Sequence, residues 1–107
     1  MVAEQDRIVI ERFKKLMLER GVPVHSTVLF GSRARGEPNP DSDYDVLVVV
    51  EQLDHGIQKK ISHCAWEAGF EDCLLIVPVV VTRDEIEHSP FRSSLLMQAI
   101  HEEGITI

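Results

Sequence analysis

Hydrophobic residues recur at the spacing of a helix face in three stretches of the 107-residue chain. They predict amphipathic helices over residues 4–20, 54–68 and 90–103. Gly21 follows the first of these stretches and Gly104 follows the last, at the position where glycine commonly ends a helix. Each predicted helix has one apolar face, so each is expected to pack against another element.

Short runs rich in β-branched residues lie between these helices and predict strands over 26–30, 43–50, 74–81 and 105–107. The second run is apolar from residue 46 to residue 50 without a break, which indicates burial on both faces of a sheet. Pro78 interrupts the third run and cannot donate to a strand ladder, so this strand is expected to lie at an edge of the sheet or to bulge at Pro78. Alternating helices and strands predict an α/β fold, a small mixed β-sheet covered by helices.

The length and composition limit what this fold can be. A chain of 107 residues supports one core and not two, so residues 1–107 are expected to form a single domain. Eleven Lys and Arg against eighteen Asp and Glu give a net charge of -7, which argues against non-specific binding along a nucleic-acid backbone. No apolar run approaches the ~20 residues of a membrane span, and no secretion signal is evident. Cys64 and Cys73 are therefore expected to be free thiols of a cytoplasmic protein.

Residues 31–45 carry most of the candidate chemistry, and a P-loop is one explanation for them. Gly31 and Gly36 have the right separation, with four residues between them. The next two residues should be Lys and Ser or Thr, which reach the phosphates and the magnesium ion. They are Glu37 and Pro38, and a carboxylate repels phosphate, so this explanation fails.

A calcium-binding loop of the EF-hand kind is a second explanation. Asp41, Asp43 and Asp45 match the first, third and fifth ligand positions of such a loop. The sixth position should be Gly and is Val46, and the twelfth should be Glu and is Gln52. The residues after Asp45 also predict a strand instead of a helix, so this explanation fails as well.

A two-metal site for phosphoryl or nucleotidyl transfer is the third explanation. Asp43 and Asp45 are two residues apart at the start of a predicted strand, so their carboxylates point to one side, and Tyr44 points to the other. Hard cations such as Mg²⁺ prefer carboxylate and phosphate oxygens. Gly31 allows backbone N–H groups close to a phosphate, and the Ser32 hydroxyl adds a donor. A phosphate cradle beside an acid pair is what this chemistry needs.

Gly31-Ser32, ten intervening residues and then Asp43-Tyr44-Asp45 resemble the signature of the DNA polymerase β-like nucleotidyltransferase superfamily. The sequence GSRARG followed by DSDYDVLV is similar to the motif of the minimal nucleotidyltransferases, which include MntA-type antitoxins. The resemblance implies the nucleotidyltransferase fold and Mg²⁺ or Mn²⁺ as cofactor. It also implies transfer of a nucleoside monophosphate from a nucleoside triphosphate, ATP foremost, to an acceptor. A HEPN-domain protein is the acceptor and partner it implies, as in a toxin–antitoxin pair.

The resemblance also assigns roles to six residues. It implies that the catalytic and metal-binding pair is Asp43 and Asp45. The nucleotide-binding residues that it implies are Gly31, Ser32, Arg33 and Arg35.

One feature departs from the superfamily pattern. A third carboxylate usually stands on a later strand, before an apolar-apolar-Thr stretch, and Val79 occupies that position here. Two function classes therefore stay open, an active nucleotidyltransferase and a catalytically impaired nucleotide-binding or antitoxin subunit. The nucleotide preference, the acceptor and the oligomeric state are open too, and a nucleic acid is expected only as an acceptor. Trp66 and Phe70, near the end of a predicted helix, are expected to be core residues.

Overall fold

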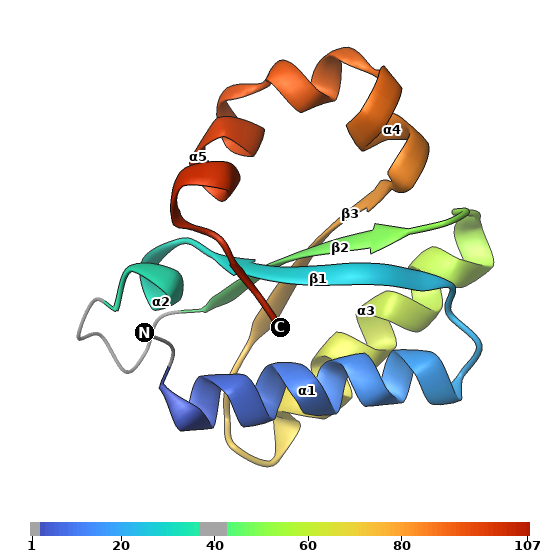
Figure 1. Cartoon of the computed structure of the whole chain (residues 1–107). Helices are drawn as coiled ribbons and strands as arrows, with labels where there is room; N and C mark the ends of the chain where they lie inside the picture. The colour runs from blue at the N-terminus through green and yellow to red at the C-terminus, as the bar shows by residue number, and fades with distance from the viewer. Residues whose placement is uncertain (1–2, 37–42) are drawn as a thin grey trace.

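Helices and strands alternate along the chain as the hydrophobic pattern predicts (Figure 1). The computed structural model describes residues 3–36 and 43–107. The elements in chain order are α1 (Glu4–Glu19), β1 (Val24–Phe30), α2 (Ser32–Arg35), β2 (Tyr44–Val50), α3 (His55–Phe70), β3 (Ile76–Thr82), α4 (Arg83–His88), the 3-10 helix η1 (Pro90–Ser93), α5 (Leu95–Glu103) and β4 (Ile105–Thr106).

The four strands form one mixed sheet in the order β3-β2-β1-β4. β1 is antiparallel to both β2 and β4, and β2 is parallel to β3. A parallel pair needs a long crossover, which α3 supplies. The order confirms the prediction that the strand with Pro78 lies at an edge of the sheet, where a residue without an N–H is tolerated.

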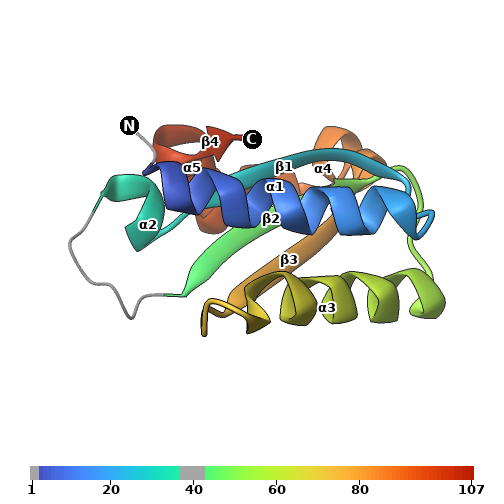
Figure 2. The same cartoon turned by 90° about the horizontal axis from the view of Figure 1, so that it is seen from below.

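Helices cover both faces of the sheet. α1 and α3 pack on one face, and α4, η1 and α5 form an arch over the other (Figures 1 and 2). Side chains alternate along β2, so Tyr44, Val46, Val48 and Val50 face the first layer while Leu47 and Val49 face the arch. Burial of β2 on both faces confirms what its unbroken apolar run indicates.

The predicted helix over 90–103 is wrong in one respect, because it is two elements. Ser94 has an extended backbone, with φ -69° and ψ 158°, and separates η1 from α5. Its hydroxyl accepts a hydrogen bond from the Met97 N–H at 3.1 Å, which caps α5. The chain therefore turns at Ser94, and α5 runs back over the sheet.

The prediction that Trp66 and Phe70 are core residues is also wrong. Their side chains are 55% and 61% exposed. α3 buries the face that carries Ile61, Cys64, Ala65 and Ala68, and these small and branched residues allow it close to the sheet. The positions of Trp66 and Phe70 in the helix are equally compatible with an exposed face, so the sequence pattern alone does not decide whether these side chains are buried.

Two further expectations can be compared with the described residues. Cys64 is buried, Cys73 is exposed, and both are free thiols, as predicted. Across residues 3–36 and 43–107, none of the helices combines the length and the apolar character that crossing a membrane requires.

Candidate active site

The glycine-serine turn and the acid pair meet at one end of the two central strands. β1 ends at Phe30, which is the register partner of Asp45 in β2. Gly31 and Ser32 follow directly, and Ser32 begins α2. Asp43 is exposed and immediately precedes β2. The structure thus brings together the segments that carry Gly31, Ser32, Asp43 and Asp45, as the sequence predicts.

Gly31 lies against the Asp45 carboxylate. A Cβ atom built at position 31 would stand 2.4 Å from Asp45 Oδ2, which is far inside van der Waals contact. The backbone at Gly31 also has φ 77° and ψ -158°, a region that is essentially restricted to glycine. Both observations explain why the site needs glycine here, and they place backbone groups of the turn beside a carboxylate.

Electrostatics at the acid pair favour a cation. Partial burial raises the pKa of Asp45, the nearby negative charge of Asp43 raises it further, and Arg35 opposes both effects. Two carboxylates that repel each other are relieved by a positive charge between them. Their oxygens are the donors that Mg²⁺ and Mn²⁺ prefer, so these residues fit a hard divalent cation.

The strand register shows which residues of β3 lie beside the acid pair. The neighbour of Asp45 in β3 is Val77, whereas Val79 is the neighbour of Leu47 and packs in the apolar cluster beneath the arch. Neither residue is acidic. Within the described part of the chain, no group of three or more His, Cys, Asp or Glu side chains could hold a metal ion. Among the described residues, a cation at Asp43 and Asp45 would therefore have these two carboxylates as ligands, and a bound ligand or water could supply further oxygen donors.

Arg33 belongs to a buried polar cluster that links three elements. Its guanidinium lies 4.3 Å from the centre of the Tyr44 ring and 3.4 Å from Asp6 Oδ1. The Tyr44 hydroxyl donates a hydrogen bond of 2.6 Å to the same oxygen of Asp6. Tyr44 therefore points away from the acid pair, as predicted, and joins β2 to α1 and α2.

The sequence analysis missed Asp6, although a signal for it exists. Asp6 precedes Val9, Ile10 and Phe13 by three, four and seven residues, so it continues the apolar face of α1. A carboxylate at a core-facing position needs a polar partner inside the protein. Asp6 is 5% exposed, and its partners are Arg33 and Tyr44.

Arg35 connects α2 to the arch. Its Nη1 donates to both carboxylate oxygens of Glu103, at 3.1 and 3.0 Å. Its positive charge also partly offsets the rise in the pKa of Asp45 that burial and Asp43 cause. Arg35 thus supplies a positive charge near Asp45, and its hydrogen bonds to Glu103 hold the Arg35 side chain at the end of α5.

A family comparison identifies the domain to which this geometry belongs. The model of the family described as "Nucleotidyltransferase domain" matches residues 10–102. This chain is a member of the nucleotidyltransferase domain family. The match covers most of the chain and includes both the glycine-serine turn and the acid pair.

The nucleotidyltransferase domain is also similar in fold to solved toxin–antitoxin structures. One is a toxin–antitoxin with AMP-PNP, with a TM-score of 0.62 and 20% identity over 90% of this chain and 69% of that chain. Another is the tri-AMPylated Shewanella oneidensis HEPN toxin in complex with MNT antitoxin, with a TM-score of 0.58 and 17% identity over 94% and 70%. A variant of the MntA–HpeT pair has a TM-score of 0.61 and 20% identity over 92% and 70%. No curated protein matches the sequence significantly.

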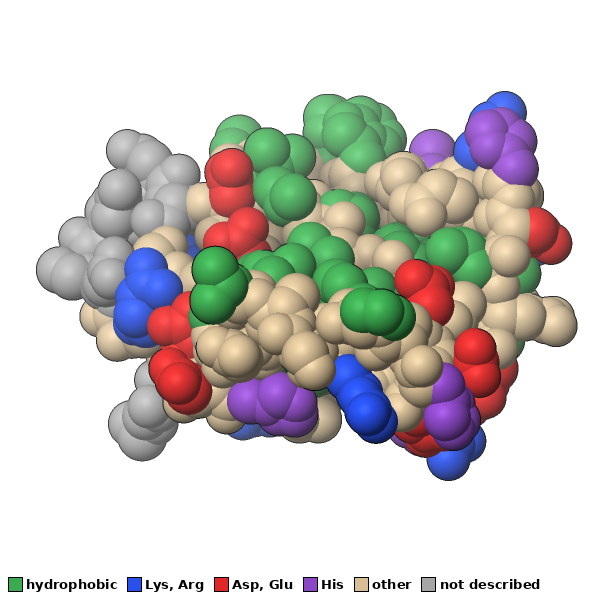
Figure 3. Space-filling model, turned by 90° about the horizontal axis from the view of Figure 1, so that it is seen from above, with side chains coloured by type: hydrophobic (Ala, Val, Ile, Leu, Met, Phe, Trp, Pro, Cys, Tyr) green, Lys and Arg blue, Asp and Glu red, His purple; other side chains and the backbone are tan. Residues whose placement is uncertain are grey.

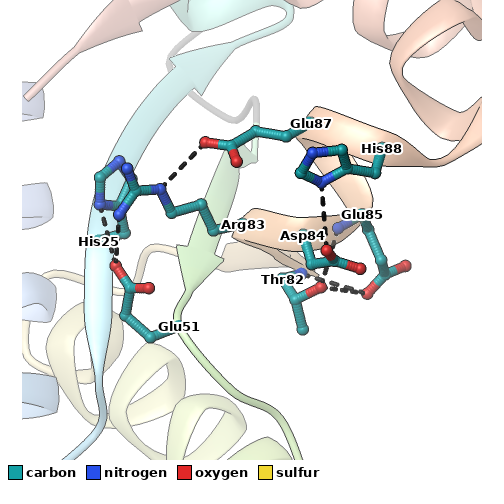
Figure 4. Close-up of polar contacts among 8 residues, drawn as sticks. All are labelled: His25, Glu51, Thr82, Arg83, Asp84, Glu85, Glu87 and His88. Atoms are coloured by element: carbon teal, nitrogen blue, oxygen red, sulfur yellow. Dashed lines mark hydrogen bonds and ion pairs between the residues drawn. The ribbon is translucent and has the colours of Figure 1, made fainter.

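A second polar cluster of this nucleotidyltransferase domain lies at the other end of β2 (Figure 4). Glu51 contacts His25 at 3.3 Å and Arg83 at 3.4 Å, and Arg83 also pairs with Glu87. Thr82 and Glu85 form a capping box at the start of α4. These side chains are largely exposed, so solvent screens each pair and it contributes little to stability. The cluster fixes where α4 begins and is remote in the sheet from the acid pair.

An apolar hollow of about 290 Å³ separates the sheet from the arch. Val28, Leu47 and Val49 line it from the sheet, and Met97 and Ile100 line it from α5. It opens on the same face of the sheet as Asp45, because Leu47 and Val49 follow Asp45 at two-residue intervals. The hollow is a gap in the packing of the arch and carries no acid of its own.

Proposed function

We propose that this domain transfers a nucleoside monophosphate from a nucleoside triphosphate, ATP foremost, to a hydroxyl group of a partner protein. The observation that carries the proposal is the contact of the Gly31 backbone with Asp45, beside Asp43, at the end of two paired strands. Family membership supports nucleotidyl transfer in general. The similar structures, described as a toxin–antitoxin with AMP-PNP and as an AMPylated HEPN toxin with MNT antitoxin, support ATP and a HEPN-domain acceptor.

The metal proposed for this reaction is Mg²⁺ or Mn²⁺. Asp43 and Asp45 would hold it, because their repulsion favours a cation and their oxygens suit a hard one. When bound, such an ion neutralises the charge of the triphosphate and polarises a phosphoryl oxygen.

The residues of the chain position the triphosphate for in-line transfer. In this proposal Gly31 and Ser32 bind the β- and γ-phosphates through the backbone and the hydroxyl, and Arg35 adds positive charge beside them. The acceptor hydroxyl oxygen attacks the α-phosphorus and forms the new P–O bond. The bond between the α-phosphorus and its bridging oxygen breaks, pyrophosphate leaves, and the hydroxyl proton passes to water.

Arg33 has a supporting role in this proposal. Its guanidinium is engaged by Asp6 and Tyr44, and it holds the turn that begins at Ser32 against β2. Arg33 could contact a phosphate only if its buried ion pair with Asp6 were broken. We therefore propose that Arg33 orients the nucleotide-binding turn and that Arg35 is the better candidate for the nucleotide itself.

Val77 supports a second candidate function, an impaired subunit that binds nucleotide without turning it over. The residue beside Asp45 in β3 is Val77, so a third carboxylate is missing from that position. Loss of a general base typically costs about 10²–10⁴-fold in rate. A partner protein docked in a fixed pose offsets part of this loss by orientation, which is why we propose a protein acceptor instead of a free small molecule.

Transfer of labelled nucleotide from ATP to a purified HEPN-domain partner tests the proposal. We expect wild-type protein with Mg²⁺ to label the partner and Asp45→Ala to leave it unlabelled. Calorimetry should show Mg²⁺-dependent ATP binding by wild type that Asp45→Ala loses. Binding without any label on the partner would favour the impaired subunit. Label that survives Asp45→Ala would refute the site.

The proposed compartment is the cytoplasm, where the thiols of Cys64 and Cys73 stay reduced.

A further inference from the structure

Large apolar side chains are exposed on α3 and at the start of β3, the strand beside the one that carries Asp45. Trp66 and Phe70 in α3 are 55% and 61% exposed, and Leu75, just before β3, is 53% exposed. We refer to Trp66, Phe70 and Leu75 as the α3–β3 patch. Val77, which is 38% exposed, lies between the patch and its register partner Asp45. Figure 3 shows hydrophobic side chains gathered over the sheet and along one edge, with acidic side chains beside them.

The α3–β3 patch has the composition of a binding surface. The rings of Trp66 and Phe70 lie 4.8 Å apart, so they form one continuous apolar area instead of two scattered side chains. Neither ring is needed for the core, because α3 packs on the sheet through its opposite face. Exposed tryptophan and phenylalanine are enriched where proteins bind one another, and tryptophan often dominates the binding energy.

Charge selects the kind of partner that the patch accepts. Glu71 directly follows Phe70, and Asp43 directly precedes Tyr44, whose N–H donates to the Leu75 carbonyl. Both carboxylates are exposed, and the whole chain carries a net charge of -7. A second copy of this chain would bring the same excess of negative charge to the contact, which costs free energy. An apolar surface flanked by Lys or Arg complements both the patch and its rim.

The open edge of β3 limits the way a partner approaches. β3 is the edge strand of the sheet, and such an edge usually invites a further strand. Pro78 stands in the middle of β3 and has no N–H to donate, so an added strand would miss a hydrogen bond there. A helix makes its contacts through side chains and needs no backbone hydrogen bonds from the edge.

We propose that the α3–β3 patch binds the acceptor protein through a helix with an apolar face flanked by Lys or Arg. This inference rests on the function proposed above and names the surface that holds the acceptor for it. A helix seated on Leu75 lies next to Val77, two residues further along the chain, and Val77 is the register partner of Asp45. Docking there supplies the orientation that a site without a third carboxylate requires.

Fluorescence of Trp66 tests the inference, because Trp66 is the only tryptophan in the chain. The probe is a synthetic helical peptide with Leu at the spacing of one face and Lys on the flanks. A matched peptide carries Glu in place of each Lys. We expect the Lys peptide to shift Trp66 emission to the blue and saturate, and the Glu peptide to leave the emission unchanged at the same concentrations.

Paired surface variants locate the binding. Phe70→Ser with Leu75→Ser should weaken binding of the Lys peptide at least tenfold. The matched control is Ile8→Ser with Leu18→Ser, which removes two aliphatic side chains of similar exposure, 49% and 54%, from α1 and should change binding less than twofold. Circular dichroism checks that both variants fold. Equal weakening by the two variants, or equal binding of the two peptides, would overturn the inference.

The same variants separate this inference from the proposed function. Phe70→Ser with Leu75→Ser should keep Mg²⁺-dependent ATP binding in calorimetry and lose at least tenfold in transfer to the HEPN-domain partner. Asp45→Ala should keep peptide binding and lose transfer. If Phe70→Ser with Leu75→Ser transfers nucleotide at the wild-type rate, the docking surface alone is refuted. If Asp45→Ala transfers nucleotide at the wild-type rate, the proposed function alone is refuted.

Discussion

Position 31 requires glycine for two independent reasons. The backbone torsions exclude a residue with a Cβ, and the Asp45 carboxylate fills the space that the Cβ would take. Gly36 offers a comparison, because it also has a positive φ, 73°, but apart from its chain neighbours no atom of the described residues lies within 4 Å of its Cβ position. The two glycines separate the cost of the backbone from the cost of the contact.

Gly31→Ala should lower the free energy of unfolding by about 2–3 kcal/mol, since strained torsions and a clash add together. Gly36→Ala should cost about 1 kcal/mol from its torsions alone. Urea unfolding measures both. Calorimetry should show at least tenfold weaker Mg²⁺-ATP binding for Gly31→Ala and nearly unchanged binding for Gly36→Ala. Equal effects at the two positions would mean that the contact with Asp45 is unimportant.

Asp45 carries its charge at a cost to stability. Its pKa is raised by burial and by Asp43, so the folded state holds the proton more tightly than the unfolded chain does. The contribution of Asp45 to stability is therefore greatest below the ordinary pKa of 3.8 and falls as the pH rises through the folded-state pKa. Above that pH the ionised carboxylate lowers stability by a constant amount.

Asp45→Asn should consequently raise the free energy of unfolding at pH 7, and the gain should vanish near pH 3, where the wild-type carboxyl is protonated in both states. Urea unfolding of both proteins at the two pH values measures the gain. A gain of equal size at pH 3 would show that it comes from packing and not from charge.

At the scale of elements, the cluster of Asp6, Arg33 and Tyr44 holds α1, α2 and β2 together. It fixes the turn at Ser32 against the strand that bears Asp45, from the side of the sheet opposite the acid pair. We propose that this cluster positions the site from that side without contacting the substrate.

Tyr44→Phe removes the hydroxyl that donates to Asp6 and should cost about 1–2 kcal/mol of stability, because a buried charged acceptor loses a hydrogen bond. Thermal unfolding measures this loss. A double-mutant cycle with Asp6→Asn should show a coupling of about 1 kcal/mol or more between the two side chains. Additive losses would mean that the hydrogen bond contributes little.

The pairing of β2 with β3 decides where a third carboxylate could act. Val77→Asp places an acid beside Asp45, whereas Val79→Asp places one beside Leu47 in the apolar cluster. Measured with saturating partner protein, Val77→Asp should raise the rate of nucleotide transfer, up to about 10²-fold, as expected for a gained base. Val79→Asp should instead lose about 1–3 kcal/mol of stability and gain no rate. A faster Val79→Asp enzyme would refute the register argument.

At the scale of the whole molecule, the charge of -7 and the apolar α3–β3 patch act on different steps of binding. Charge attracts a Lys- or Arg-flanked partner over distances near the Debye length, and the patch holds it after contact. The two contributions respond differently to salt, because screening weakens the first and leaves apolar contacts largely intact.

The association rate of the Lys peptide should therefore fall about tenfold or more between 0.05 M and 0.5 M NaCl, while its dissociation rate changes much less. Stopped-flow fluorescence of Trp66 measures both rates. A salt-independent association rate would show that the acidic rim does not attract the partner.

The sequence by itself determined the order of the four strands and of the three main helical stretches between them, the edge position of the strand with Pro78, and the spacing of Gly31, Ser32, Asp43 and Asp45. These features are local, because periodicity, turn residues and strand alternation act over a few neighbours along the chain. The family resemblance rests on the same local spacing, and the family comparison confirms it.

Only the tertiary structure decided which faces meet. It turned Trp66 and Phe70 outward, split the predicted last helix at Ser94, buried Asp6 with Arg33 and Tyr44, and set Val77 instead of Val79 beside Asp45. Each of these depends on contacts between residues distant in the chain. A helical or strand pattern states that a face is apolar, but the register between strands and the layer above them determine what that face touches.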